Sequence, residues 1–106
     1  MKKQQGDVII RSAAIPAGAK KVCRTRRGYV LAEGEATGHA HVIEETEGVE
    51  MYEFDGVLYL SVATPAVVTH EEHKGLALAR GTYRVGFVRE YDPWAEEADR
   101  VRRLAD

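Results

Sequence analysis

The dipeptide Asp55-Gly56 lies between two runs in which apolar and polar residues largely alternate, Val49–Phe54 and Val57–Val62. Asp-Gly between such runs is the strongest short-range signal of a β-hairpin, because both residues tolerate the positive φ angles of a two-residue turn. Successive side chains of a strand point to opposite faces, so the leucines of the second run share one face. The sequence therefore predicts an antiparallel hairpin with its second arm near the centre of a sheet, which favours an all-β fold.

Turn residues divide most of the remaining chain into short runs that are also typical of strands. These runs cover residues 8–11, 20–28, 29–32, the positions after Gly38, 76–79 and 82–91. There is no alternation of strands with helices that would indicate a parallel sheet. We expect about eight short strands in a small antiparallel barrel or sandwich.

The pattern changes at Asp92-Pro93, which supplies a natural N-cap and a residue suited to the first helical position. Apolar residues from Trp94 onward recur at helical spacing, so we predict a helix over residues 92–106. A chain of 106 residues is long enough for one hydrophobic core. We therefore expect a single domain, with the β part in residues 1–91 and a C-terminal helix that packs on the sheet, or closes one end of a barrel, through Trp94.

Composition restricts the function classes. Hydrophobic residues make up 44% and charged residues 30%, and the formal net charge of −2 lacks the basic excess of a non-specific nucleic-acid binder. The single cysteine, Cys23, excludes an intramolecular disulfide and suits a reducing compartment. No run approaches the ~18 apolar residues of a membrane span, and the polar start lacks the apolar core of a signal peptide. We expect a soluble cytoplasmic protein with no membrane contact.

All four histidines of the chain fall in two close pairs, His39 with His41 and His70 with His73. Residues two apart on a strand project from one face, so the first pair is expected side by side. Imidazole and carboxylate suit Zn, Fe, Mn or Ni, and three such ligands with an open position suit metal-assisted hydrolysis. We therefore interpret the two pairs as halves of one divalent-metal site. The candidate ligands are His39, His41, Glu45, His70 and His73, and the candidate catalytic residues are the four histidines with Glu35 or Glu45 as base.

A second interpretation is metal-free catalysis, because two histidines can act as base and acid near neutral pH. Such a site could cleave RNA by promoting attack of the RNA's own 2′-hydroxyl on the adjacent phosphate, while basic residues bind the phosphates. The candidate phosphate-binding residues are Lys20, Lys21, Arg24, Arg26, Arg27, Lys74 and Arg89. Glu71 and Glu72 count against this interpretation, because carboxylates repel phosphate. The histidine pairs and the basic residues are compatible with a small-molecule substrate or with RNA. They are also compatible with a homodimer.

Each pattern also has a purely structural interpretation. The basic segment 20–28 is typical of an exposed strand edge and hairpin loop, where lysine and arginine discourage pairing with other chains. The sequence from His70 to His73 is equally typical of a solvated turn, and Glu45 of a turn carboxylate. A third hypothesis is a non-enzymatic binding or adaptor module, in which an edge strand or the C-terminal helix docks a partner.

Gly34 followed by His39-x-His41-x-x-x-Glu45 resembles the first metal-binding motif of cupins, over less than half of the chain. Cupins are small β-barrels in which two histidines, a glutamate and a later histidine bind a divalent metal. The resemblance implies a β-barrel in which His70 or His73 is the later ligand.

The order of several other motifs resembles a family of small, uncharacterised proteins of bacterial and phage genomes. The motifs are Gln5-Gly6-Asp7-Val8, Gly34-Glu35-x-Thr37-Gly38-His39-x-His41, His70-Glu71-Glu72-His73, Gly81-x-Tyr83 and Arg89-Glu90-Tyr91. That family has no assigned activity. The resemblance therefore groups the histidines with Glu35 and residues 89–91 but implies no substrate.

Overall fold

The structure is a computed structural model that describes residues 2–34 and 38–88, and the statements below concern these residues. This part of the chain forms ten β-strands and no helix, so it contains no helix long and apolar enough to cross a membrane. The strands are β1 (Lys2–Gln5), β2 (Val8–Ser12), β3 (Lys20–Val22), β4 (Tyr29–Glu33), β5 (Ala40–Ile43), β6 (Val49–Phe54), β7 (Val57–Val62), β8 (Ala66–Val68), β9 (Leu76–Leu78) and β10 (Gly81–Phe87).

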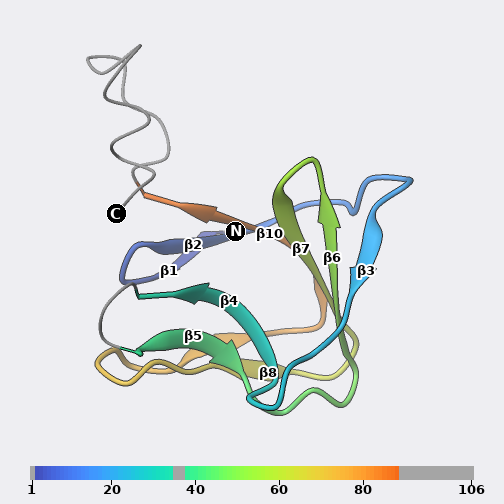
Figure 1. Ribbon diagram of the computed structural model, residues 1–106. Coiled ribbons are helices and arrows are strands. Elements are labelled where there is room, and N and C mark those ends of the chain that lie inside the picture. The colour runs from blue at the N-terminus through green and yellow to red at the C-terminus, as the bar shows by residue number, and fades with distance from the viewer. Residues whose placement is uncertain (1, 35–37, 89–106) are drawn as a thin grey trace, which may run out of the picture.

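Six strands form one antiparallel sheet in the order β1-β2-β10-β7-β6-β3 (Figure 1). Strand β7 lies between β10 and β6, so its predicted central position is confirmed. The β6–β7 hairpin turns at Asp55 (φ 54°) and Gly56 (φ 81°), which confirms the predicted Asp-Gly turn. The lysine-containing strand β3 forms one edge of the sheet, in agreement with the edge interpretation of the basic segment.

The other four strands form two antiparallel hairpins, β4–β5 and β8–β9, which lie below the six-stranded sheet in the view of Figure 1. An isolated bridge joins them. The Val42 N–H donates to the Thr69 carbonyl at 3.0 Å, and the Thr69 N–H donates to the Val42 carbonyl at 2.8 Å. The loop that follows β8, residues 69–75, is therefore held against β5.

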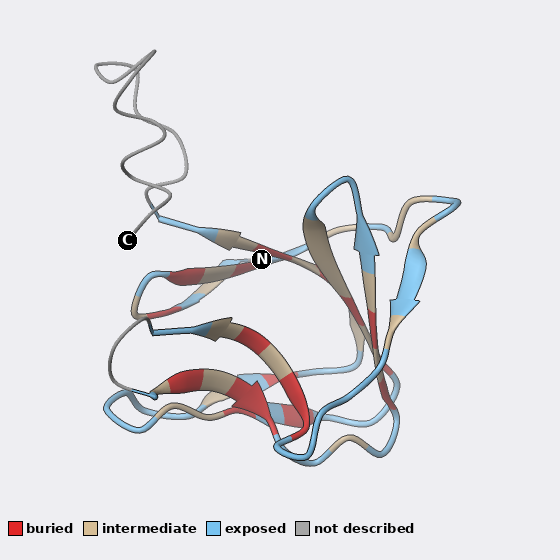
Figure 2. Ribbon diagram, in the orientation of Figure 1, coloured by how far each residue is buried: buried red, intermediate tan, exposed pale blue. Residues whose placement is uncertain are grey.

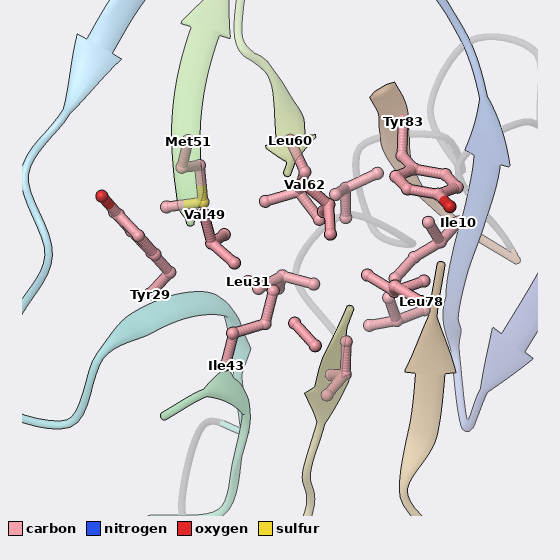
Figure 3. Close-up of a cluster of buried hydrophobic side chains, with 14 residues drawn as sticks. Ile10, Tyr29, Leu31, Ile43, Val49, Met51, Leu60, Val62, Leu78 and Tyr83 are labelled. Carbon is pink, nitrogen blue, oxygen red and sulfur yellow. The ribbon is translucent and has the colours of Figure 1, made fainter. Parts of the chain in front are cut away.

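The core lies between the six-stranded sheet and the two hairpins, where buried side chains from all three sheets meet (Figures 2 and 3). Ile10, Leu60, Ile43, Val68 and Leu78 are each at most 1% exposed. Burying one such side chain contributes roughly 1.5–3 kcal/mol relative to leaving it in water. These contacts dock the hairpins on the sheet and so fix the loops at the hairpin ends.

The predicted all-β antiparallel architecture is confirmed for the described residues, but their strands number ten rather than about eight. The six-stranded sheet ends at β1 and β3, so the described strands form no closed barrel, which excludes one of the two predicted alternatives. Strand β1 was not predicted because residues 2–5 are all polar, and it forms by pairing with β2 from Lys2↔Arg11 to Gln5↔Val8. The predicted helix over residues 92–106, including Trp94, lies outside the described residues.

Candidate functional site

The four histidines lie together, although β6, β7 and β8 separate the two pairs in the chain. His70 is central: its ring centroid is 4.3 Å from that of His41, 4.6 Å from that of His73 and 5.7 Å from that of His39. The His41 and His73 centroids are 6.1 Å apart. We call this group the histidine cluster. The hypothesis of one metal site formed by both pairs requires such convergence, whereas the acid–base hypothesis requires only two neighbouring histidines.

Two segments deliver the histidines. His41 belongs to β5, and His39 immediately precedes this strand, which begins one residue later than predicted. His70 and His73 lie in the loop that joins β8 to β9. The bridge between β5 and the first residue of this loop holds the two segments side by side. The cluster is therefore a product of hairpin docking and not of one continuous motif.

Glu71 ties the loop to β5 and to the basic segment. Its Oε1 accepts a hydrogen bond from the Ala40 N–H at 3.0 Å, and its Oε2 pairs with Arg27 Nη2 at 3.1 Å. The hydrogen bond from Ala40, followed by that from its own amide, holds the pKa of the Glu71 carboxyl below its usual range. Glu71 was not among the predicted site residues, and its position between the two histidines of the loop was the only signal for it.

Gln5 also contributes to the site, and the residue is only 3% exposed. Its Nε2 donates to the carbonyls of Val68 at 3.0 Å and Lys74 at 2.7 Å, and its Oε1 lies 2.8 Å from His41 Nδ1. Since carbonyls only accept, the amide must turn its NH₂ toward them, and Oε1 then accepts from His41 Nδ1–H. Burial, followed by the neighbouring histidines, lowers the pKa of His41 from 6.5 to about 4. The ring is therefore neutral at pH 7, with its lone pair on Nε2.

His70 has the opposite arrangement. Its Nδ1 accepts a hydrogen bond from the Glu72 N–H at 3.0 Å, so a neutral His70 carries its proton on Nε2. The Glu72 carboxylate in turn lies near the cluster, with Oε2 3.6 Å from His39 Nδ1. The carboxylates of Glu71 and Glu72 therefore lie near imidazoles of the histidine cluster.

Three side chains are close enough to share a metal ion. One ligand atom each from His39, His70 and Glu71 lies within 4.8 Å of the other two. A tetrahedral ion with bonds of ~2.1 Å holds its ligands roughly 3.4 Å apart. To hold one ion, these side chains would have to move closer to that spacing; His41 and His73 lie beside His70.

Of the two glutamates expected in the site, the structure describes only Glu45, and it places this residue elsewhere. Glu45 lies beyond β5, which ends at Ile43, and it lines a separate hollow with Pro65 and Val67. It is not a member of the ligand group found among the described residues, because the chain has left the strand before residue 45. Glu35 lies outside the described residues.

The basic residues expected to bind phosphate are spread over several places. Lys21 and Arg24 contact side chains of β6 and of the loop before it, each at 3.1 Å. Arg27 connects the segment to the site through Glu71. Lys20, Arg26 and Lys74 are exposed, and Arg89 lies outside the described residues. The structure therefore brings Arg27, but not Lys21 or Arg24, into contact with the site.

A hollow of about 200 Å³ opens beside the cluster. It is lined by Arg27, Ala40, Val42, Glu44, Thr69, His70 and Glu71. Its lining carries both signs of charge and backbone polar groups. A small polar molecule in this hollow would lie against His70.

The fold and the site define a small all-β domain in which two hairpins present four histidines beside a buried glutamine. The chain belongs to the family described as Domain of unknown function (DUF8820), whose model matches residues 4–87. The matched region includes Gln5, Glu71 and all four histidines, and membership agrees with the expected likeness to uncharacterised proteins. No curated protein and no solved structure gives a significant match.

Proposed function

We propose that this protein binds a divalent transition-metal ion at the histidine cluster, with His39, His70 and Glu71 as principal ligands. The observation that carries the proposal is the approach of one ligand atom from each residue to within 4.8 Å of the others. Imidazole nitrogen and carboxylate oxygen suit zinc, iron, manganese or nickel. The ion would lie between β5 and the loop 69–75.

Electrostatics supports the proposal. Metal ligation requires neutral imidazoles, and the lowered pKa of His41 keeps that ring neutral at physiological pH. Neighbouring rings with centroids 4.3 and 4.6 Å apart would repel one another if they were protonated together. Glu71 and Glu72 add negative charge, which a divalent cation offsets.

Binding would change the hydrogen bonding of His70. A metal-bound imidazole usually donates its second N–H to a neighbour, whereas His70 Nδ1 accepts the Glu72 N–H at 3.0 Å. Ligation of this ring would therefore replace the hydrogen bond from Glu72. Both partners of that hydrogen bond lie in the loop 69–75, and the bridge to β5 is made by backbone groups of Thr69 and Val42.

Three protein ligands leave a coordination position for water or a substrate atom. An ion held at this site would act as a Lewis acid that activates water near neutral pH. The hollow beside His70 gives a small polar substrate access to this position. Metal-assisted hydrolysis is therefore the reaction class that we propose for the site.

Elemental analysis and calorimetric titration of tag-free protein test the proposal. We expect one zinc, iron, manganese or nickel ion per chain and loss of binding in the double variant His39→Ala/His70→Ala. Glu71→Gln should weaken affinity by more than the roughly 10–100-fold that loss of an outer-shell partner costs, because it replaces a charged ligand by a neutral amide. Glu45→Gln is the matched control, since Glu45 is an exposed carboxylate of the adjoining loop that lies outside the ligand group.

Two results would contradict the metal site. One is the absence of stoichiometric binding of any of the four metals to folded wild-type protein. The other is an equal effect of Glu71→Gln and Glu45→Gln, because it would mean that proximity to the cluster is irrelevant. Circular dichroism of each variant would separate loss of a ligand from loss of the fold.

A second candidate function is metal-independent RNA cleavage by a histidine acid–base pair. Two observations support it. Neutral His41 has a lone pair on its Nε2, whereas neutral His70 has a proton on its Nε2. The centroids of these two rings are 4.3 Å apart. The pairing of Arg27 with Glu71 leaves less positive charge for phosphate, so the metal site is better supported. RNA cleavage that survives EDTA and follows a bell-shaped pH profile would favour this candidate, and its absence would remove it.

A further inference from the structure

Gln5 is a buried polar side chain that joins all three sheets. It belongs to β1 of the six-stranded sheet, its NH₂ group donates to the last residue of β8 and to Lys74, and its oxygen contacts His41 of β5. The residue is 3% exposed, so water cannot replace these partners. An amide this deeply buried and with every group engaged has a fixed orientation.

The fixed amide determines which nitrogen of His41 carries a proton. Val68 and Lys74 offer carbonyl oxygens, which only accept, so rotating the amide by 180° would oppose three oxygen atoms. Gln5 Oε1 must therefore face His41 Nδ1, at 2.8 Å, and accept its proton. A histidine held in this way has one free lone pair, on Nε2.

We infer that Gln5 is a positioning residue that holds His41 in the Nδ1–H tautomer and makes Nε2 the atom through which His41 joins the metal ion. The inference rests on the proposed metal site and adds His41 to its three ligands. The His41 ring centroid is 4.3 Å from that of His70, but His41 lies outside the group whose ligand atoms are within 4.8 Å of one another, so its ring would have to move toward the ion. With four protein ligands, a water or substrate atom would need a fifth coordination position. A group that fixes the tautomer and ring orientation of a ligating histidine commonly raises metal affinity 10–100-fold. Here that group comes from a strand outside both segments that carry the histidines.

The side-chain chemistry at position 5 explains why an amide is required. Glutamate has a similar shape but would place an acceptor oxygen against the carbonyls of Val68 and Lys74. Methionine would fill the space but remove the amide's hydrogen bonds to both carbonyls and to His41 Nδ1. An amide combines two donors with one acceptor in the directions that the three neighbours need.

The test is a two-bond ¹H–¹⁵N spectrum of metal-free protein labelled at histidine nitrogen. We expect the His41 signals of wild-type protein to show a protonated Nδ1 and an unprotonated Nε2. Gln5→Met should convert them to a mixture or to the Nε2–H form, and should weaken zinc affinity roughly 10–100-fold. Gln4→Met is the matched control, since Gln4 is exposed on the same strand and donates only to the Gly6 carbonyl among the described contacts. It should leave both readouts unchanged.

The outcomes separate this inference from the proposed function. A wild-type spectrum with the proton on His41 Nε2 would overturn the inference even if zinc binds, and this measurement needs no variant to fold. A zinc-induced shift at Nδ1 instead of Nε2 would also overturn it. If wild type has the expected tautomer but no zinc binds, the metal site is wrong, and so is the ligand role of His41 that depends on it. Zinc bound at Nε2 and weakened by Gln5→Met alone supports both.

Discussion

Protonation of His41 opposes folding. Burial and the nearby histidines lower its pKa in the folded chain to about 4, from an ordinary value of 6.5. As the pH falls below about 6.5, the unfolded chain takes up the proton first. The stability contributed by neutral His41 is therefore complete above pH ~6.5 and is lost as the pH falls to about 4.

This contribution can be measured by urea unfolding of metal-free protein in EDTA, for wild type and His41→Gln. The ring is partly exposed, so solvent screening reduces the effect, and we expect about 1–2 kcal/mol. The difference in unfolding free energy between the two proteins should shrink by that amount between about pH 7.5 and about pH 4.5. A difference that does not change with pH would show that His41 is not the titrating group.

At the scale of elements, the corner between β3 and β4 controls the docking of the β4–β5 hairpin. Gly28 closes a turn with Thr25, whose N–H donates to the Gly28 carbonyl at 2.7 Å. Its φ is +114°, and a Cβ at this position would overlap the backbone carbonyl of Ile43. Only glycine therefore allows the corner to pack against the end of β5, which in turn carries His41.

Replacing Gly28 by alanine should destabilise the fold more than the same change at another left-handed glycine. Gly18 has φ +91°, and a Cβ there would only touch the Phe54 ring at 3.8 Å. We expect a loss of about 1 kcal/mol for Gly18→Ala from backbone strain, and about 3 kcal/mol for Gly28→Ala from strain and overlap together. Thermal and urea unfolding would measure both, and equal losses would contradict the proposed contact with Ile43.

At the scale of the whole molecule, metal binding should stabilise the docking of the two hairpins. The proposed ligands come from the start of β5 and from the loop after β8, so only the folded arrangement brings them together. An ion at 100 times its dissociation constant would stabilise the folded state by about 2.7 kcal/mol. For a domain of this size, that corresponds to a rise in Tm of about 10 °C.

Scanning calorimetry with zinc and with EDTA would test this expectation. The double variant His39→Ala/His70→Ala should melt at the same temperature in both conditions. A zinc-dependent rise that persists in the double variant would locate the stabilising ion elsewhere in the chain.

Local chemistry determined which parts of the fold could be predicted. The Asp55-Gly56 turn is encoded by residues adjacent in the chain, and the structure has it as predicted. Strand β1 has no apolar alternation, because it forms by pairing with β2 and its one buried residue is the polar Gln5. A strand that depends on its neighbour in this way cannot be recognised from its own composition.

The same distinction holds for the site. Two close histidine pairs were enough to suggest a site, but Glu71 and Gln5 were not among its predicted residues. Their partners are Ala40 and His41, which lie 31 and 36 residues away in the chain, so topology decides these contacts. Glu45 was expected because it continues the spacing of His41 along a strand, and the strand ends too early.

The amide of Gln5 has a consequence for motion. If the β8–β9 hairpin separates from β1, both carbonyls that fix the NH₂ group are lost together. The amide is then free to turn over and to present a donor to His41 Nδ1, which would move the imidazole proton to the other nitrogen. Opening of the β8–β9 hairpin would thus switch the tautomer of His41 on the β4–β5 hairpin. A sparsely opened form would be visible as tautomer exchange at a single ring before any strand of the large sheet unfolds.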